Sequence, residues 1–255
     1  MTEWKAEPSL SAQLYDTIGA TYTVTRHTEP RIAERIWTAL DDAETVLNVG
    51  AGAGSYEPSD RQLLAVEPSA LMRSQRPAGA APCIAGVAEH LPFADQTFDA
   101  AMAVCTLHHW QDPIAGLQEM RRVARRVVVF LFDTSDTSLF WLTRDYLPEF
   151  AELRSRRVLA SLPQLAGAIG ARAEPVPIPW DCTDGFFEAH WRRPEAYLDE
   201  GVRRGVSVWA ALGPVVEQRA VTDLRDDLDT GRWAERNRDI TNLDEAELGA
   251  RLLIA

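Results

Sequence analysis

The chain has 255 residues, 46% of them apolar and 25% charged, which is the balance of a soluble globular protein with room for one large α/β domain. Its formal net charge of −12 would repel a phosphate backbone, so nucleic acid is excluded as an expected partner. The N-terminus lacks the profile of a signal peptide, and no apolar run approaches the roughly 20 residues that a membrane span needs. We therefore expect a cytoplasmic protein with no membrane partner, and the sequence leaves its oligomeric state open.

The cysteines and the basic cluster carry little functional signal. Cys83, Cys105 and Cys182 are odd in number and unrelated in spacing, so they predict neither a disulfide framework nor a metal site, and a reducing compartment follows. Residues 121–126 contain four arginines where a helix is expected to end. Cations there complement the helix dipole, and a functional basic patch is the alternative.

Strands and helices are expected to alternate after an amphipathic, helical N-terminal segment at residues 1–44. Ser69 opens a short helix that Pro77 stops, and Asp112 with Pro113 begins a longer one that runs to about residue 125. The expected strands are 45–50, 63–66, 83–85, 98–105 and 127–132. This alternation predicts a parallel, doubly wound sheet.

The second half of the chain is less regular. Residues 138–151 and 163–169 are predicted as helices, and residues 184–240 as mainly helical. Three prolines in residues 173–180 restrict a strand there to a sheet edge or to an irregular one. The apolar residues 249–255 predict a terminal strand.

A glycine-rich turn follows the first expected strand. Gly50, Gly52 and Gly54 allow the backbone to turn tightly and to approach a ligand without a Cβ atom in the way. Glu67 follows Gly50 by 17 residues, at the end of the second strand, where an acidic side chain can accept hydrogen bonds from both hydroxyls of a ribose. The dinucleotide fingerprint needs a small third glycine position where Ser55 stands, so a dehydrogenase that uses NAD is disfavoured.

Several ordered motifs within residues 45–133 carry a resemblance to a known family. VLNVGAGAG, VEPS, GVAEHLPFADQTFD, AVCTLHHW and DPIAGLQEMRRVAR resemble the small-molecule class I methyltransferases that use S-adenosyl-L-methionine, among them enzymes of ubiquinone and menaquinone biosynthesis and of natural-product tailoring. The resemblance implies a Rossmann-like α/β sheet of seven mostly parallel strands. It further implies an antiparallel last strand, from residue 248 to 254, beside residues 127–132.

The same resemblance implies a division of the chain and a set of binding residues. Residues 1–44 would form a helical lid, 45–180 the cofactor-binding core, 181–246 a helical insertion that caps the site, and 247–255 the final strand. The residues implied to bind the cofactor are Asn48, Gly50 and Gly52 at the methionyl part and ribose, Glu67 at the ribose hydroxyls, Pro68, Ser69 and Met72 beside the adenine, Ala88 and Glu89 at its edge, and Cys105 beneath the methionine.

Two features depart from the family pattern. Val87 stands where relatives often have an acidic residue, so the adenine amino group would depend on backbone carbonyls or on Glu89. Only residues 51–62 connect the first two strands, near the minimum for a parallel crossover, and Pro58 interrupts them, so the usual first helix has two turns at most. Arg26 is a candidate to bind the methionine carboxylate in place of that helix, or it is a surface cation.

The candidate lid and the candidate base each have an alternative. Tyr15 and Tyr22 are spaced to share a helix face, which fits a cofactor lid or a buried core. His109, next to His108 at the carboxyl edge of the sheet, is the first candidate base, and a structural histidine is the alternative. A metal site from these histidines and Asp112 is conceivable, but no metal is expected. His190 is a second candidate base in an aromatic segment that could line an acceptor pocket or pack a helical layer.

These features predict methyl transfer from S-adenosyl-L-methionine to a small, aromatic or apolar acceptor. The alternative is a protein that binds this cofactor in a regulatory or cyclase role without methyl transfer.

Overall fold

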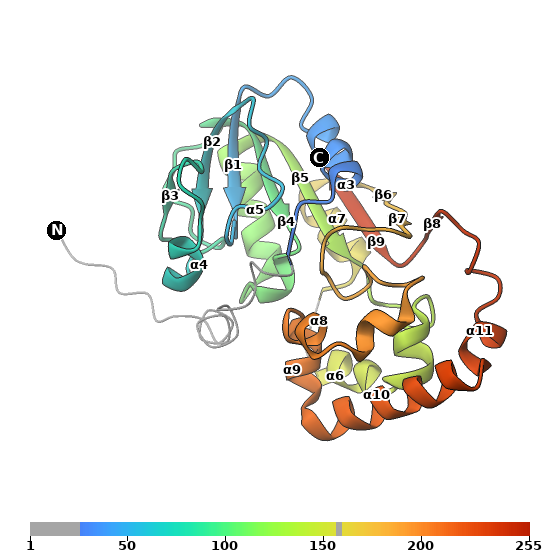
Figure 1. The fold of residues 1–255 in the computed structure, drawn as a ribbon. Helices are drawn as coiled ribbons and strands as arrows, with labels where there is room; N and C mark the ends of the chain where they lie inside the picture. Colours follow the sequence, from blue (N-terminus) through green and yellow to red (C-terminus); the bar gives the residue numbers. More distant parts are fainter. Residues whose placement is uncertain (1–25, 157–159) are drawn as a thin grey trace.

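A computed structural model describes residues 26–156 and 160–255 (Figure 1). Tyr15 and Tyr22 of the expected lid lie outside the described residues. The last part of that segment forms α3 (Pro30–Ala39), which begins with a proline and has the side chain of Glu29 as its N-cap. Ile32 and Ile36 are buried on the inner face of α3, as the amphipathic pattern predicts.

The sheet has seven strands in the order β3-β2-β1-β4-β5-β9-β6, which confirms the predicted seven-stranded architecture. The strands β1 to β5 run parallel, and β9 lies antiparallel between β5 and β6, with Val128 opposite Ile254. The predicted pairing of the last strand with the fifth is therefore confirmed. The strands are β1 (Thr45–Val49), β2 (Gln62–Val66), β3 (Cys83–Ile84), β4 (Phe98–Val104), β5 (Ala124–Phe132), β6 (Arg172–Pro175) and β9 (Ala250–Ile254).

Helices cover both faces of the sheet. On one face α5 (Pro113–Val123) and α7 (Leu162–Ile169) bury Leu117, Met120 and Leu165 against the strands. On the other face α3 packs over β5 in a core that continues into the second half of the chain. The short α4 (Ala70–Ser74) follows β2, and Ser69 caps it by accepting a hydrogen bond from Met72 N–H, as the sequence predicts.

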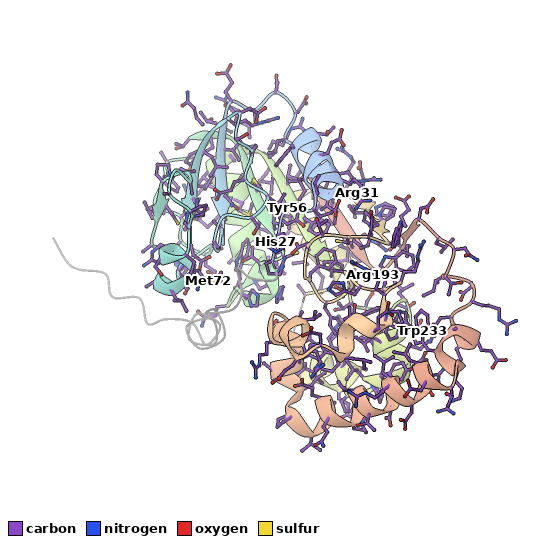
Figure 2. All side chains as sticks on the ribbon, in the orientation of Figure 1. His27, Arg31, Tyr56, Met72, Arg193 and Trp233 are labelled. Atoms are coloured by element: carbon purple, nitrogen blue, oxygen red, sulfur yellow. The ribbon has the colours of Figure 1, made fainter. Side chains whose placement is uncertain are left out.

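A layer of helices, here called the helical cap, lies beyond the carboxyl ends of the parallel strands (Figure 1). Its core is aromatic: Trp141, Trp191 and Tyr197 are buried, and Trp141 Nε1–H donates to the Trp191 carbonyl at 2.6 Å. Figure 2 shows Arg193 and Trp233 in this layer. The cap consists of η3 (Leu142–Tyr146), α6 (Glu149–Arg156), η4 (Pro194–Leu198), α8 (Glu200–Arg204), α9 (Ser207–Leu212), α10 (Pro214–Asp229) and α11 (Arg232–Arg236).

Three predicted elements differ in the structure. The helix expected at residues 138–151 is broken into η3 and α6, because Leu147 has a non-helical backbone (φ −128°, ψ 56°) and Pro148 has no N–H to continue the ladder. The strand expected at residues 173–180 is two strands in two sheets: β6 at the main edge, and β7 (Ile178–Pro179) paired with β8 (Glu245–Ala246). Finally, α5 ends at Val123 and β5 begins at Ala124, so half of the basic cluster lies on a strand.

Candidate active site

The glycine-rich loop fits closely against the end of β4. Gly50, Gly52 and Gly54 have φ of +69°, +54° and +99°, the left-handed region that favours glycine. A Cβ atom added to Gly50 would lie 2.2 Å from Thr106 Oγ1, too close for any side chain. The N–H of Gly50 donates to the Val66 carbonyl and that of Gly52 to Glu67, so the loop lies tightly between the ends of β2 and β4.

Glu67 connects this loop to the end of β2. Its buried carboxylate accepts hydrogen bonds from Gly52 N–H (2.8 Å) and Ser69 N–H (2.9 Å). Burial raises the pKa of Glu67, and the two amides lower it. Met72 packs beside Gly52, with its Cε 3.4 Å from where a Cβ of that glycine would lie, and Figure 2 shows Met72 at this end of the sheet. The structure therefore brings Gly52, Glu67 and Met72 together, as the motifs require of a nucleoside site.

An ion pair takes the place of the missing crossover helix. The residues between β1 and β2 form turns only. Within that connection Glu57 accepts from Arg76 Nη2 at 2.8 Å and from Asn48 Nδ2 at 3.0 Å. Arg76 is buried and lies against Gly54. The side chain of Asn48 is therefore held beneath the glycine loop by Glu57.

The residues expected at the adenine lie around the ends of β2 and β3. Ala88 is buried and Pro68 is exposed. Glu89 directs Oε1 away from that edge, because this atom accepts from the backbone N–H groups of Gln111 (2.8 Å) and Asp112 (3.0 Å). Glu89 thus fixes the loop that leads into α5.

Arg26 is bound to a protein carboxylate. Its Nε donates to Asp184 Oδ1 at 2.7 Å and its Nη2 to Asp184 Oδ2 at 3.1 Å, in a forked ion pair. Tyr56 OH donates to the same carboxylate at 2.7 Å, and burial raises the pKa of Tyr56 far above its ordinary value. His27 N–H also donates to Asp184 (3.2 Å), and Figure 2 shows Tyr56 and His27 between the sheet and the helical cap. Asp184 therefore joins the segment before α3, the crossover loop and the cap.

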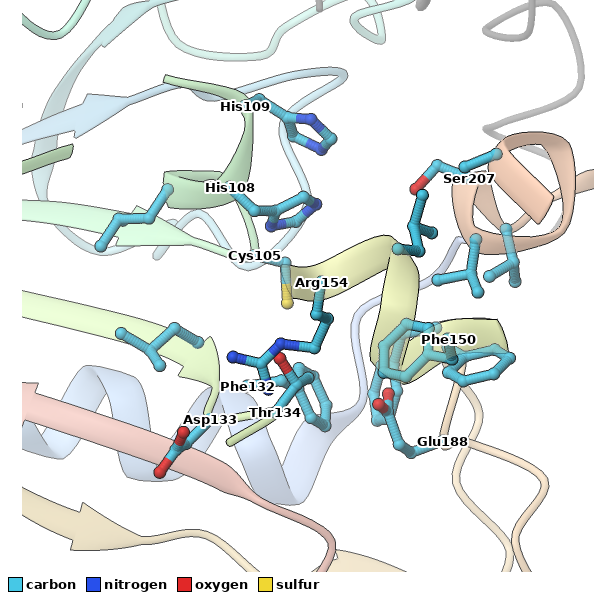
Figure 3. Close-up of a pocket in the computed structure, with 18 of the residues that line it drawn as sticks. Cys105, His108, His109, Phe132, Asp133, Thr134, Phe150, Arg154, Glu188 and Ser207 are labelled. Atoms are coloured by element: carbon cyan, nitrogen blue, oxygen red, sulfur yellow. The ribbon is translucent and has the colours of Figure 1, made fainter. Parts of the chain in front are cut away.

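A cavity of about 330 Å³ separates the carboxyl edge of β4 and β5 from the helical cap (Figure 3). Most of its wall is apolar, with phenyl rings from β5, α6 and the segment before η4, and its polar groups include two arginines, two histidines and two carboxylates. Its lining includes Arg26, Cys105, Leu107, His108, His109, Leu131, Phe132, Asp133, Phe150, Leu153, Arg154, Leu165, Phe186, Phe187, Glu188, Val206 and Val208. The shape and polarity suit a small ligand.

The histidines and Cys105 form one side of this cavity. His108 and His109 lie on η2 (Leu107–His109), with ring centroids 3.7 Å apart. Cys105 directly follows β4 and has a left-handed backbone conformation (φ +52°). This conformation is uncommon for residues other than glycine and recurs at functional sites. Burial raises the pKa of the Cys105 thiol to about 12, so the group is a neutral part of the wall.

His190 is placed elsewhere. Its ring packs on Tyr197, with centroids 5.7 Å apart, and it is absent from the cavity lining. Burial lowers the pKa of His190 to about 4, and its Nδ1 is buried with no hydrogen-bond partner in the part of the chain that is described. The two candidate bases are therefore in different environments, and only His109 faces the cavity.

Three polar residues of this region were not singled out from the sequence. Asp184 and Glu188 flank the aromatic pair Phe186-Phe187, and acidic residues in so apolar a segment are the signal that could have indicated them. Arg154 reaches the cavity from α6, and nothing in its sequence context separates it from a surface cation. Within residues 26–156 and 160–255, no three His, Cys, Asp or Glu side chains gather as metal ligands would, and no helix is long and apolar enough to cross a membrane.

Comparisons with known proteins agree with this geometry. A family model described as a methyltransferase domain matches residues 47–132. The demethylmenaquinone methyltransferase of Mycobacterium sp. (strain KMS) is 28% identical over 181 residues, which cover 66% of this chain and 74% of that protein. A solved structure from Anabaena variabilis ATCC 29413, provisionally described as a methyltransferase from an antibiotic biosynthesis pathway, is 30% identical with a TM-score of 0.80, over 90% of this chain and 98% of that one. The [4+2]-cyclase SpnF shares the fold alone, at 16% identity and a TM-score of 0.57 over 97% of this chain and 95% of that one.

Proposed function

Since the chain belongs to the class I S-adenosylmethionine-dependent methyltransferases, we propose that it methylates a small aromatic or apolar acceptor bound in the cavity beneath the helical cap. Methyl transfer from S-adenosyl-L-methionine to a small molecule is the activity of this family. The observation that supports the finer statement is the position of the cavity. Cys105 and His109, directly after β4, line it, and its walls are largely phenyl and aliphatic.

The cofactor residues are proposed from the loop geometry. Glu67 would accept hydrogen bonds from the ribose hydroxyls, because each of its oxygens holds one backbone amide and keeps a second lone pair. Gly50 and Gly52 would face the methionyl part and the ribose, with Asn48 beneath them and Cys105 at the floor. Pro68, Met72 and Ala88 would border the adenine, whose amino group would meet backbone carbonyls and not the carboxylate oxygen of Glu89 that fixes the α5 loop. The bound cofactor supplies an electrophilic sulfonium methyl group.

Arg26 and the N-terminal lid are proposed to work together. Arg26, which Asp184 holds at the cavity wall, is proposed to bind the methionine carboxylate of the cofactor. Tyr15 and Tyr22 would close over the cofactor and exclude water, which favours transfer of a cationic group. Residues 181–246, which supply η4 and α8 to α11 of the helical cap, are proposed as the acceptor-binding unit on the core at residues 45–180, and η3 and α6 pack with them.

His109 is proposed as the group that removes the acceptor proton. Its ring faces the cavity from η2, which follows β4 and Cys105. An imidazole near neutral pH can accept a proton from a hydroxyl or an acidic carbon. His190 would take this role only if the acceptor reached a site outside the cavity described above.

Calorimetry with S-adenosylhomocysteine, and with NAD as the control ligand, tests the cofactor site. Saturable binding of S-adenosylhomocysteine in the micromolar range and none of NAD is expected. The acceptor site is tested with Val206→Trp, which fills the cavity from the cap, and with Val215→Trp, on the exposed outer face of α10. In a methylation assay Val206→Trp should raise the acceptor KM about tenfold or more, a loss of about 1.4 kcal/mol. An equal effect of both changes would place the acceptor elsewhere.

A further inference from the structure

Glu188 is a buried acid at the far end of the cavity. It is 7% exposed, and Figure 3 shows its carboxyl group near Phe150 and well separated from His108 and His109. Phe132, Phe186 and Phe187 line the same cavity, and the rings of Phe132 and Phe186 lie 5.1 Å apart. The surroundings of this carboxyl group are therefore mainly aromatic.

The carboxyl group of Glu188 accepts a hydrogen bond from its own backbone N–H, and no side chain of residues 26–154 or 160–255 forms a hydrogen bond or an ion pair with it. The positive charge of Arg26 lowers the pKa of Glu188. The Arg26 guanidinium is itself hydrogen-bonded at two points to Asp184, whose side chain is 1% exposed. Arg26 is therefore hydrogen-bonded to Asp184 and acts on Glu188 only through its charge. Burial raises the pKa of Glu188 to about 8, although the hydrogen bond from its own backbone N–H and the charge of Arg26 both lower it.

A buried carboxyl group that is bonded only to its own backbone N–H still costs free energy, because its remaining acceptor positions are unfilled. The apolar wall of the cavity would be more stable with a leucine at this position, because buried ionic groups are often replaced by apolar ones without loss. Such groups are expected where a ligand supplies the missing hydrogen bond.

We propose that Glu188 determines acceptor specificity by binding an N–H or O–H donor of the acceptor, an amine or a hydroxyl, at the end of the cavity remote from His109. This rests on the proposed function, since it takes the cavity to be the acceptor site. The phenyl rings hold an apolar body, and the carboxyl group of Glu188 accepts the donor. If the donor is an ammonium group, the ring faces also attract its charge.

A matched series of probes with one apolar body tests the proposal. 2-Phenylethanol carries a hydroxyl group, 2-phenylethylamine carries an ammonium group, and 2-phenylethyl methyl ether carries no donor. Each is titrated by ligand-observed NMR into the full chain saturated with S-adenosylhomocysteine. The variants are Glu188→Gln, which keeps a neutral acceptor oxygen, and Glu188→Leu, which removes it. Glu195→Leu, at an exposed position on η4, is the control.

At a pH above 8, where the carboxyl group of Glu188 is ionised and can only accept, the wild type should bind at least one donor probe about tenfold or more tightly than the ether, the scale of a hydrogen bond to a charged group. Glu188→Leu should abolish that preference and leave ether binding equal or stronger, and Glu195→Leu should behave as the wild type. Glu188→Gln separates the two donor types: it retains the preference for a hydroxyl group and loses the preference for an ammonium group.

Equal binding of the ether and the donor probes to the wild type would overturn the proposal, as would a preference that survives in Glu188→Leu or the absence of saturable binding of every probe. Thermal unfolding of each variant confirms that it is folded. Failure of the proposed function is recognised separately, because S-adenosylhomocysteine would then not bind in the calorimeter, whatever the probes do.

Discussion

At the scale of single residues, the cofactor site depends on side chains that the backbone holds in place before any ligand arrives. Glu67 is the clearest case, since it is fixed by two amide donors from two different segments. Its spacing from Gly50 could be read from the sequence, because both the strand end and the glycine turn are local patterns. Asp184 and Glu188 could not be found in this way. Their roles come from Arg26, which lies 158 positions before Asp184, and from cavity walls that belong to several separate segments.

Replacement of Glu67 tests the ribose site. Glu67→Ala should weaken S-adenosylhomocysteine binding by about 1.5–3 kcal/mol, the scale of a hydrogen bond to a charged group. Calorimetry measures the change in Kd, with Glu174→Ala on the exposed edge strand β6 as the control. An unchanged Kd for Glu67→Ala would contradict the ribose assignment.

Replacement of His109 tests the proposed base. His109→Gln should lower turnover by about 100-fold or more, the low end of general-base contributions, with little change in cofactor affinity. The acid limb of the wild-type pH profile, near the pKa of the imidazole, should disappear. One acceptor is used throughout, because an amine or thiol acceptor also titrates.

Parallel changes identify which histidine acts. His108→Gln reports on the neighbouring ring of η2, and His190→Gln on the ring buried against Tyr197. Full turnover in His109→Gln together with loss in His190→Gln would mean that the base lies in the helical cap. If none of the three changes lowers turnover, catalysis consists of positioning the acceptor against the cofactor.

At the scale of elements, the predicted strands and helices agree with the structure where the signal is local. The strands β1, β2, β4 and β5 were predicted from apolar runs, and the starts of α4 and α5 from Ser69 and Asp112. The strand predicted at residues 173–180 was wrong, because its two pairing partners are distant in the sequence. Residues 173–180 are one apolar, proline-rich run in the sequence, yet β6 pairs with β9 and β7 with β8.

The terminal strand β9 is expected to be essential for folding, because it joins β5 to β6 and its Leu253 is fully buried. Deletion of residues 247–255 should abolish cooperative unfolding. Leu253→Ala should lower the free energy of unfolding by about 2–5 kcal/mol, the usual range for a buried leucine. Leu243→Ala, at a residue 43% exposed, should have a much smaller effect. Urea unfolding followed by circular dichroism compares the deletion with the two leucine variants. A deletion variant as stable as the wild type would show that β9 is not needed for folding.

At the scale of the whole molecule, the cavity proposed for the acceptor exists only because two halves of the chain meet. The family resemblance covered residues 45–133 of the core, and it implied the cofactor, a sheet of seven strands and the place of the last strand beside the fifth. The cap could be predicted as helical but not as the wall of a particular cavity, because Phe150, Phe186 and Val206 reach it from three separate segments. Asp184, bonded to Arg26 and Tyr56, holds the cap to the core.

The same buried charges predict how stability depends on pH. Burial raises the pKa of Glu188 from 4.5 to about 8, so between these values the folded state keeps a proton that the unfolded state has lost, and stability falls as the pH rises. Burial lowers the pKa of His190 from 6.5 to about 4, so stability falls as the pH drops through this range. Burial raises the pKa of Glu29, but hydrogen bonds from Arg31 and Thr183 outweigh it and lower this pKa to about 2. Stability therefore falls further as the pH drops from 4.5 to 2.

The contributions of Glu188 and His190 oppose each other between pH 4.5 and 6.5, so stability should be nearly constant there. Above pH 6.5 only Glu188 remains of the three, and stability should fall towards pH 8 with a slope of up to about 1.4 kcal/mol per pH unit. Glu188→Gln removes the titrating group, so its stability should stay level over this range, whereas Glu245→Gln at an exposed position should retain the wild-type fall. Urea unfolding at half-unit steps of pH measures both slopes. A fall of equal size in Glu188→Gln would show that another group is responsible, and that the carboxyl group at the end of the cavity has a partner when the protein is folded.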